Sequence, residues 1–182
     1  LLANKSPDFD PGLLTTATAI AVTRTLEKTL ALKPTIKWVN DVLVDDKKIC
    51  GILTEGITDL ETQSLSQVVV GTGINFLTEI STFPPELQTR VGTLAPYVKK
   101  NRLSRNRFIA TYLNEFFKIY QNYTTGSFMD EYRAHCDLIG KHVTIQRPTG
   151  TLEVIDINDH GALVLENGKV LNSGEVIKVR KV

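Results

Sequence analysis

The chain has 182 residues, of which 42% are hydrophobic and 23% are charged. These proportions are typical of a soluble globular protein, and the length suits one good-sized domain or one domain with a small module. The formal net charge of +1 gives no reason to expect binding to nucleic acid or to an anionic membrane surface. No apolar run approaches the ~18 residues of a membrane span.

The N-terminal sequence has no basic stretch followed by an apolar one, so no signal peptide is predicted. Cys50 and Cys136 form no CxxC motif, and both are expected to be reduced thiols in a core, which fits the cytoplasm. The three histidines share no ligand spacing, and no protein metal site is predicted. Because the chain opens on two leucines rather than on Met, we expect it to be a fragment.

A helix from about Pro11 to Leu30 is the first predicted element. Asp10 can cap this helix, and proline is favoured at the first helical position. The apolar residues cover much of the circumference, as in a helix that is buried on more than one side. Lys33-Pro34 follows and prevents the helix from continuing.

A β-hairpin is predicted next, from "TIKWV" and "VLV" through a turn at Asp45-Asp46 into "KKICGILTE". A two-residue turn sets a register that places Asn40 opposite Gly51 and Asp41 opposite Cys50. A longer turn would shift this register by one residue.

The lysines of the hairpin have different expected environments. Lys47 is expected on the surface. Lys37 and Lys48 are flanked by apolar residues, so a solvated lysine and a lysine that faces a pocket both remain open. In a pocket, the ammonium group would be a good ligand for phosphate or carboxylate oxygens.

The residues between these lysines also allow two interpretations. Asn40 and Asp41 could form a simple turn or bulge, or Asp41 could accept a hydrogen bond from an amine or help to bind a metal. Trp38 is predicted to be a core residue rather than a stacking surface for a ligand.

The run "QVVVGTGINF", residues 67–76, predicts a strand buried on both faces. Gly71 and Gly73 lie at its end, where glycine permits close approach of a ligand or of another backbone. The spacing is neither a dinucleotide fingerprint nor a P-loop. These residues alone indicate an α/β domain with a basic, glycine-lined pocket for an anionic ligand, and leave the reaction open.

The second half of the chain predicts two helices and a β module. An aromatic stripe at helical spacing runs from Ser104 to Tyr123 and is expected to be core. Ser127 begins a pattern similar to a capping box, which predicts a short helix to about Cys136. Short alternating stretches with turn signals then predict a small barrel of roughly five strands. The expected domains are therefore 1–137 and 138–182.

The hairpin sequence "IKWVNDVLVDDKKICGIL" resembles the signature of biotin protein ligases (biotin–[acetyl-CoA-carboxylase] ligases), usually Lys-Trp-Pro-Asn-Asp followed by Lys-x-x-Gly-Ile-Leu. "VVVGTGINF" is similar to the Gly-x-Gly-x-Asn strand of the same family. The order of the other elements also matches, so the resemblance covers essentially the whole chain. Val39 stands where the family usually has proline, and we expect this to change little.

The resemblance implies a fold and an activity. The implied fold is α/β (α+β), with a mixed sheet and flanking helices related to class II aminoacyl-tRNA synthetase-like ligases, plus a small C-terminal SH3-like β-barrel. The implied enzyme joins biotin to ATP, with Mg²⁺, to form biotinyl-5′-AMP. It then transfers biotin to a lysine of biotin carboxyl carrier protein. Members often dimerise by sheet pairing, so a homodimer is also implied.

The resemblance also assigns roles to residues. It implies that Lys48, Lys37 and Asp41 are catalytic, and that Asp41 orients the incoming lysine or a magnesium-bound water. The implied biotin-binding residues are Lys48, Gly51 and Gly71. The implied adenylate-binding residues are Lys37, Asn40, Gly73 and Asn75.

One departure and two alternatives accompany this hypothesis. The glycine- and arginine-rich loop that closes over biotin in the family is not in this sequence, so the chain as given is expected to be inactive or severely impaired. One alternative is a catalytically inactive ligase-like protein with a biotin-binding or regulatory role. The other is a relative of the lipoate ligases, which share the fold.

Overall fold

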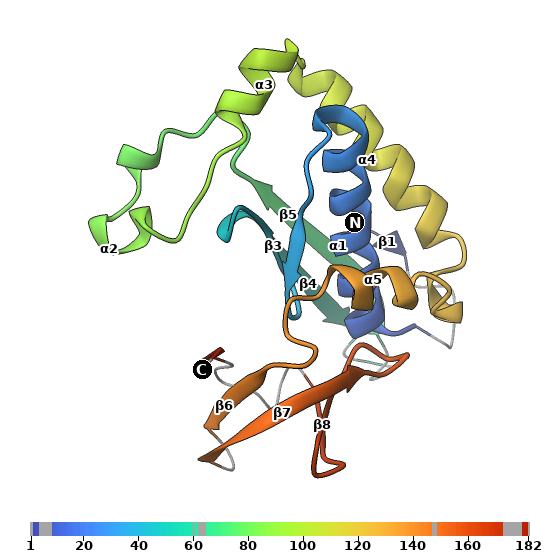
Figure 1. Ribbon diagram of the computed structural model, residues 1–182. Helices are drawn as coiled ribbons and strands as arrows, with labels where there is room; N and C mark the ends of the chain where they lie inside the picture. Colours follow the sequence, from blue (N-terminus) through green and yellow to red (C-terminus); the bar gives the residue numbers. More distant parts are fainter. Residues whose placement is uncertain are drawn as a thin grey trace.

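The computed structural model shows an α/β body followed by a small β module (Figure 1). This confirms the predicted fold class. The structure describes residues 2–3, 9–59, 61, 65–146, 149–172 and 180–181, with the backbone alone for 2–3, 145–146, 149 and 180–181.

The body contains a five-stranded sheet in the order β1-β5-β4-β3-β2. Its strands are β1 (Leu2–Ala3), β2 (Thr35–Lys37), β3 (Asp41–Val44), β4 (Lys47–Thr58) and β5 (Leu65–Ile74). Every ladder between these described strands is antiparallel, whereas the family resemblance implied a mixed sheet. The reason is that β2 to β5 follow one another through short connections, which join antiparallel neighbours. Parallel pairing is described for two isolated bridges, Ile36–Cys136 and Lys48–Val91.

Helices cover one face of this sheet (Figure 1). The helix α1 packs against β3, β4 and α4, and the Thr15 hydroxyl bonds the Thr54 hydroxyl of β4 at 2.8 Å. The helical segments are α1 (Pro11–Leu30), η1 (Ile80–Thr82), α2 (Pro85–Gln88), α3 (Ala95–Asn101), α4 (Arg105–Tyr120), η2 (Tyr123–Thr125) and α5 (Met129–His135).

Local signals determine the ends of α1, and the predicted range is confirmed. The Asp10 carboxylate accepts a hydrogen bond from the Leu13 backbone N–H at 2.9 Å, and proline occupies the first helical position. The helix ends at Leu30 because Ala31 adopts a left-handed conformation with φ of 52° and donates its N–H to the Glu27 carbonyl. Its buried threonine hydroxyls bond carbonyls one turn earlier, so they are satisfied inside the core.

Three predictions of burial or capping are wrong. On α4, Phe108 and Phe116 are buried, but Ile109, Leu113 and Phe117 are 45%, 42% and 48% exposed, because α4 packs along one stripe only. Of the β5 side chains, all of which are described, only that of Val68 is fully buried, since the face of the sheet opposite α1 is open. The cap of α5 is Phe128 without a side-chain hydrogen bond, so Ser127 forms no capping box.

The C-terminal module is a five-stranded antiparallel sheet in the order β10-β6-β7-β8-β9. Its interior holds fully buried side chains such as Val154, Ile157 and Leu163. The predicted turn residues Pro148 and Ser173-Gly174 lie outside the described residues. The strands are β6 (His142–Gln146), β7 (Thr149–Ile157), β8 (Leu163–Leu165), β9 (Val170–Leu171) and β10 (Arg180–Lys181).

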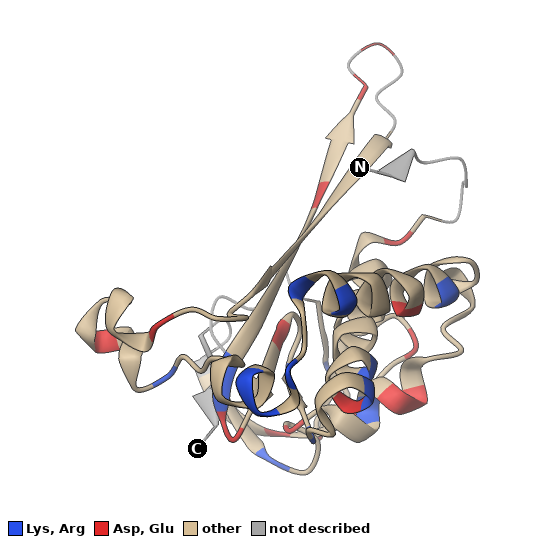
Figure 2. Cartoon of the chain, turned by 90° about the horizontal axis from the view of Figure 1, so that it is seen from above, with Lys and Arg blue, Asp and Glu red and all other residues tan. Residues whose placement is uncertain are grey.

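Figure 2 shows that β4 and β5 form a long hairpin that projects from the body, and that acidic and basic residues are interspersed. Within the described part of the chain, no helix is both long and apolar enough to cross a membrane.

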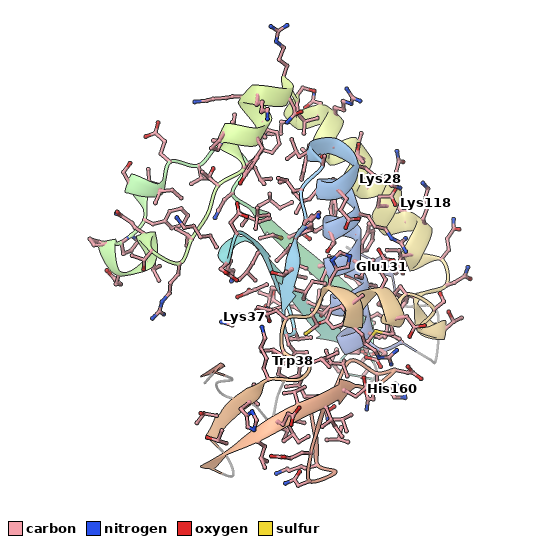
Figure 3. The ribbon with its side chains drawn as sticks, viewed as in Figure 1. Lys28, Lys37, Trp38, Lys118, Glu131 and His160 are labelled. Atoms are coloured by element: carbon pink, nitrogen blue, oxygen red, sulfur yellow. The ribbon has the colours of Figure 1, made fainter. Side chains whose placement is uncertain are left out.

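A buried carboxylate connects the two long helices. Glu115 of α4 is 4% exposed, and its Oε1 lies 2.8 Å from Nζ of Lys28 in α1 and 3.2 Å from Nζ of Lys118. Figure 3 shows both lysines at the junction of α1 and α4. Burial would raise the pKa of the Glu115 carboxyl, but the two bonded ammonium groups outweigh burial and lower this pKa below its ordinary value.

This lowered pKa predicts how stability depends on pH. A carboxyl with a depressed folded-state pKa adds stability above its unfolded-state pKa of about 4.3, and this contribution is lost as pH falls through the lower folded-state value. Urea unfolding between pH 6 and pH 3 should therefore show a steeper loss of stability for the wild type than for Glu115→Gln. Equal pH dependence in the two proteins would show that Glu115 does not make this contribution.

Candidate active site

Four of the predicted site residues lie in one row across the open face of the main sheet. The strand registers pair Lys37 of β2 with Asp41 of β3, Asp41 with Gly51 of β4, and Gly51 with Gly73 of β5. Directly paired residues of antiparallel strands face the same side of a sheet. Gly71 lies two positions further along β5, opposite Leu53, on the same face. Leu53 is 58% exposed, which confirms that this face is uncovered.

The register differs from the predicted one by a residue because β4 contains a bulge. Val44 pairs with Lys47 around a turn in which Asp45 and Asp46 both have positive φ, as predicted for a two-residue turn. Val42 pairs with Cys50 and Leu43 with Lys48, so Ile49 has no partner in β3. Asp41 therefore lies opposite Gly51 rather than opposite Cys50.

The bulge decides which way Lys48 points. In a regular strand, residues three apart face opposite sides. Here Ile49 and Cys50 are both buried at 1% exposure, which returns Lys48 and Gly51 to the same open face. A β-carbon built on Gly51 would lie 3.1 Å from both Cε and Nζ of Lys48. The glycine thus leaves the space in which the lysine lies.

Asp41 holds the Lys48 ammonium group in place. Lys48 Nζ lies 2.5 Å from Asp41 Oδ1, and the two side chains are 44% and 19% exposed. An ammonium group has three N–H donors, and one contact with a carboxylate leaves others for a ligand. The arrangement therefore places a fixed positive charge beside the glycines of β4 and β5.

Lys48 lines a hollow of about 340 Å³ on this face together with Gly51, Gly73 and Asn75. Asn75 lies at its wall, where its side-chain amide donates to the Gly92 carbonyl at 2.9 Å. The lining is completed by Ile49, Cys50, Ile74, Phe83 and Val91.

Part of this wall comes from a segment that sequence reasoning did not assign to the site. The backbone of residues 90–92 runs along the start of β4: Lys48 N–H donates to the Arg90 carbonyl at 2.9 Å, and Gly92 N–H donates to the Lys48 carbonyl at 2.8 Å. A β-carbon on Gly92 would lie 2.9 Å from the Lys47 β-carbon, so only glycine allows this approach. Nothing in the local sequence pattern indicates that this loop returns to β4.

Lys37 and Asn40 lie at the edge of this site rather than in the hollow. Of the two interpretations left open for Asn40, the structure shows the turn: residues 38–40 connect β2 to β3 and interrupt the hairpin strand. The Lys37 side chain is exposed, and it makes no hydrogen bond or ion pair with the side chains and backbone groups that the structure describes. The Asn40 side-chain amide donates to the Ile52 carbonyl at 2.7 Å, which attaches the turn to β4.

Trp38 is a core residue, as predicted. Its side chain is buried, and its indole N–H donates to the Gly161 carbonyl of the C-terminal module at 2.8 Å. Figure 3 shows Lys37 and Trp38 between the body and the module. The peptide bond between Trp38 and Val39 is cis.

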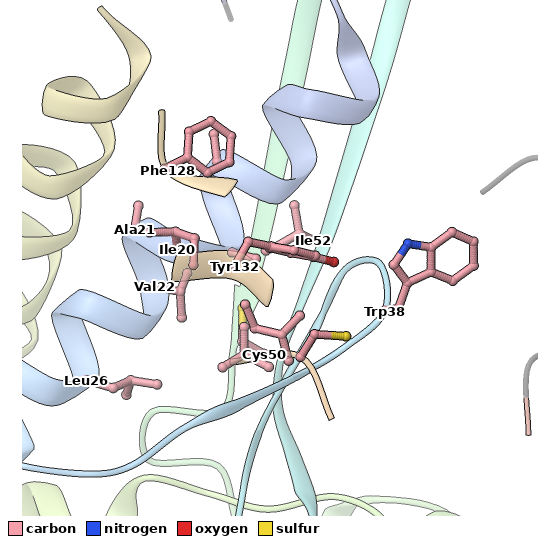
Figure 4. Close-up of a cluster of buried hydrophobic side chains, with 14 of the residues drawn as sticks. Ile20, Ala21, Val22, Leu26, Trp38, Cys50, Ile52, Phe128 and Tyr132 are labelled. Carbon is pink, nitrogen blue, oxygen red and sulfur yellow. The ribbon is translucent and has the colours of Figure 1, made fainter. Parts of the chain in front are cut away.

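Among the described residues, neither the Cys50 thiol nor a cluster of metal ligands adds reactive chemistry to this site. Cys50 is a free thiol that packs in the core with Ile52 (Figure 4). Burial raises its pKa to about 12, against the smaller opposite effect of Lys48, so it stays protonated and is no nucleophile at neutral pH. Among the described residues, no group of three or more His, Cys, Asp or Glu side chains could hold a metal ion.

Two family models match the sequence, one near each end of the chain. Residues 2–75 match the model of the biotin/lipoate A/B protein ligase family. Residues 138–179 match the model of the biotin protein ligase C-terminal domain.

Two curated relatives are each 30% identical to the chain. The bifunctional ligase/repressor BirA of Bacillus subtilis aligns over 86% of this chain and 49% of its own length. The biotin–[acetyl-CoA-carboxylase] ligase of Mycobacterium tuberculosis aligns over 93% of this chain and 63% of its own length. The chain thus spans about half of the Bacillus relative and less than two thirds of the mycobacterial one.

The fold matches solved structures as well. The biotin protein ligase of Aquifex aeolicus, in complex with biotin and ATP, superposes with a TM-score of 0.80 over 99% of this chain and 76% of that one, at 22% identity. Together with the two family models and the curated relatives, this shows that the chain belongs to the biotin protein ligase family.

Proposed function

We propose that this chain provides part of the active site of a biotin protein ligase. The reaction joins biotin and ATP into biotinyl-5′-AMP with release of pyrophosphate, and then transfers biotin to a lysine of biotin carboxyl carrier protein. The observation that carries the proposal is the Lys48 ammonium group, which lies over Gly51 and beside Asp41 in a hollow lined by Gly73 and Asn75.

The first step requires two anions to approach each other. The biotin carboxylate attacks the α-phosphorus of ATP, and the bond from this phosphorus to the oxygen that bridges to the β-phosphate breaks. Negative charge develops on the non-bridging oxygens, where a fixed ammonium group stabilises it. We assign this role to Lys48, since it lines the hollow and its contact with Asp41 leaves N–H donors for a ligand. Lys37, in the same row, adds positive potential from β2.

The glycines give the ligand room beside the sheet. Gly51 and Gly71 allow biotin to approach the backbone of β4 and β5, and Gly73 does so nearer the adenylate. A β-carbon on Gly73 would meet no atom closer than 3.8 Å, so this space is open. Asn75, whose amide already bonds Gly92, is assigned to the adenine, and Asn40 shapes the phosphate end.

The second step brings in the carrier. The ε-amine of a carrier lysine attacks the acyl carbon of biotinyl-AMP, the acyl–oxygen bond breaks, and AMP leaves as the amine loses a proton. Asp41 lies next to Lys48 and is assigned to orient this amine. Mg²⁺ would be held by the ATP phosphates, since the described residues form no cage of protein ligands.

The wider context is proposed on the same basis. The two buried free cysteines fit a reducing compartment, so we place the reaction in the cytoplasm. We keep the boundary between 1–137 and 138–182 as a proposal, supported by the start of the C-terminal domain match at residue 138. A homodimer formed by sheet pairing is proposed from the family resemblance.

Lys48→Ala tests the central assignment. Loss of a charge-assisted contact costs about 1.5–3 kcal/mol, so formation of biotinyl-AMP by the full-length protein should fall roughly tenfold to a hundredfold. The assay is biotin-dependent exchange of labelled pyrophosphate into ATP. Lys47→Ala is the matched control, because Lys47 is the exposed neighbouring lysine and should have wild-type activity. Activity of Lys48→Ala within a few-fold of wild type would refute the assignment.

Gly51→Ala tests the space under Lys48. The added methyl group would contact the flexible end of Lys48 and displace its ammonium group, whereas the fold has room for it. We expect at least tenfold weaker biotin binding by calorimetry, with an unchanged melting temperature. Gly150→Ala, whose β-carbon would meet nothing within 4 Å, is the control. Unchanged affinity in Gly51→Ala would argue against biotin in this hollow.

Ligand choice separates a biotin ligase from a lipoate ligase relative. A ligand at one hundred times its dissociation constant stabilises the folded state by about 2.7 kcal/mol. Biotin should therefore raise the melting temperature of the full-length protein by several degrees, and lipoate at the same concentration should not. A larger shift with lipoate would favour the alternative, and binding of biotin without any adenylate formation would indicate an inactive ligase-like protein.

A further inference from the structure

The turn between β2 and β3 is held at each of its three residues by a different part of the protein. Trp38 donates its indole N–H to the Gly161 carbonyl of the module at 2.8 Å. The Val39 carbonyl accepts a hydrogen bond from the hydroxyl of Tyr132 in α5 at 3.0 Å. Asn40 exchanges hydrogen bonds with Ile52 of β4 through both its side-chain amide and its carbonyl. This turn directly joins Lys37 to Asp41.

The module presents Gly161 from a stiff turn. Asn158 Oδ1 accepts hydrogen bonds from the backbone N–H groups of His160 and Ala162, both at 3.0 Å, and Gly161 has a φ of 78°. A β-carbon on Gly161 would lie 3.1 Å from the Thr16 methyl group of α1, so the turn lies close against the body. The Gly161 carbonyl is therefore a fixed acceptor.

The helix α5 makes contacts with both this module turn and the 38–40 turn. Tyr132 is fully buried, and its hydroxyl is directed toward the loop that carries Trp38 (Figure 4). The next residue, Arg133, donates from Nε to the Ile157 carbonyl at 2.6 Å and pairs with Asp159. One short helix thus contacts both the 38–40 turn and the 157–161 end of the module.

We propose that the module turn at residues 158–162 is a positioning element of the active site: its Gly161 carbonyl, through the Trp38 indole and together with Tyr132, fixes the turn that places Lys37 and Asp41. The inference rests on the proposed ligase function, because it assigns the two turn-flanking residues to that reaction. Asp41 in turn holds Lys48. Displacement of reacting groups by about 1 Å can reduce a rate a hundredfold, so loosening this turn should affect catalysis from a distance.

Two variants of the full-length protein each remove one hydrogen bond to the turn. Trp38→Phe deletes the indole donor, and Tyr132→Phe deletes only a hydroxyl. The matched control is Tyr97→Phe, which deletes an exposed tyrosine hydroxyl that donates to Asp45 at 2.9 Å and that bonds neither the 38–40 turn nor the module. All three are compared with wild type in biotinyl-AMP formation, with kcat and KM measured separately, in melting temperature, and in backbone hydrogen exchange.

We expect kcat of Trp38→Phe and Tyr132→Phe to fall at least tenfold, with KM for biotin and ATP changed less than threefold. Hydrogen exchange should accelerate at residues 37–42 in both variants, and at 158–162 in Trp38→Phe. Tyr97→Phe should keep its kcat. A kcat within twofold of wild type in both variants, or an equal loss in Tyr97→Phe, would overturn the proposal.

Hydrogen exchange separates this inference from the proposed function. If the wild-type protein forms no biotinyl-AMP, the ligase assignment fails, while the exchange rates still decide whether the module holds the 37–42 segment. Unchanged exchange at these residues in both variants would refute the positioning role, whatever the activity.

Discussion

The extra residue in β4 is the constraint on which the site depends. Ile49 has no partner in β3, so the strand places two successive side chains in the core and then returns to its alternation. Without this bulge, Lys48 and Gly51 would face opposite sides of the sheet. With it, the lysine, the glycine beneath it and the paired Asp41 lie together on the uncovered face.

Elements with strong local signals could be predicted from the sequence. The ends of α1 follow from Asp10 and Pro11, whose capping and φ preferences act within one turn of helix. The two-residue turn follows from Asp45 and Asp46, which adopt positive φ. The bulge could not be predicted, because the local pattern of β4 does not show that a distant segment, residues 90–92, bonds the strand at Lys48.

Burial was the least predictable property. The aromatic stripe of α4 and the apolar run of β5 both indicate which side chains group together, but periodicity does not say which elements cover them. Phe108 is buried, whereas Phe117 on the same helix is half exposed. Trp38 shows the opposite case: its burial was expected, but its partner Gly161 is 123 residues away, and only the docking of the module brings them together.

The charge arrangement is compatible with the anionic ligand proposed for this site, although the site contains an ion pair. The Lys48–Asp41 pair is partly solvated, and pairs of this kind contribute only about 0–1 kcal/mol. The other N–H groups of Lys48 can therefore donate to a second anion while the contact with Asp41 is kept. What Asp41 supplies is orientation rather than stability, since it keeps the lysine over Gly51. Any element that positions Asp41, including the turn held by Trp38, then also determines where the positive charge lies.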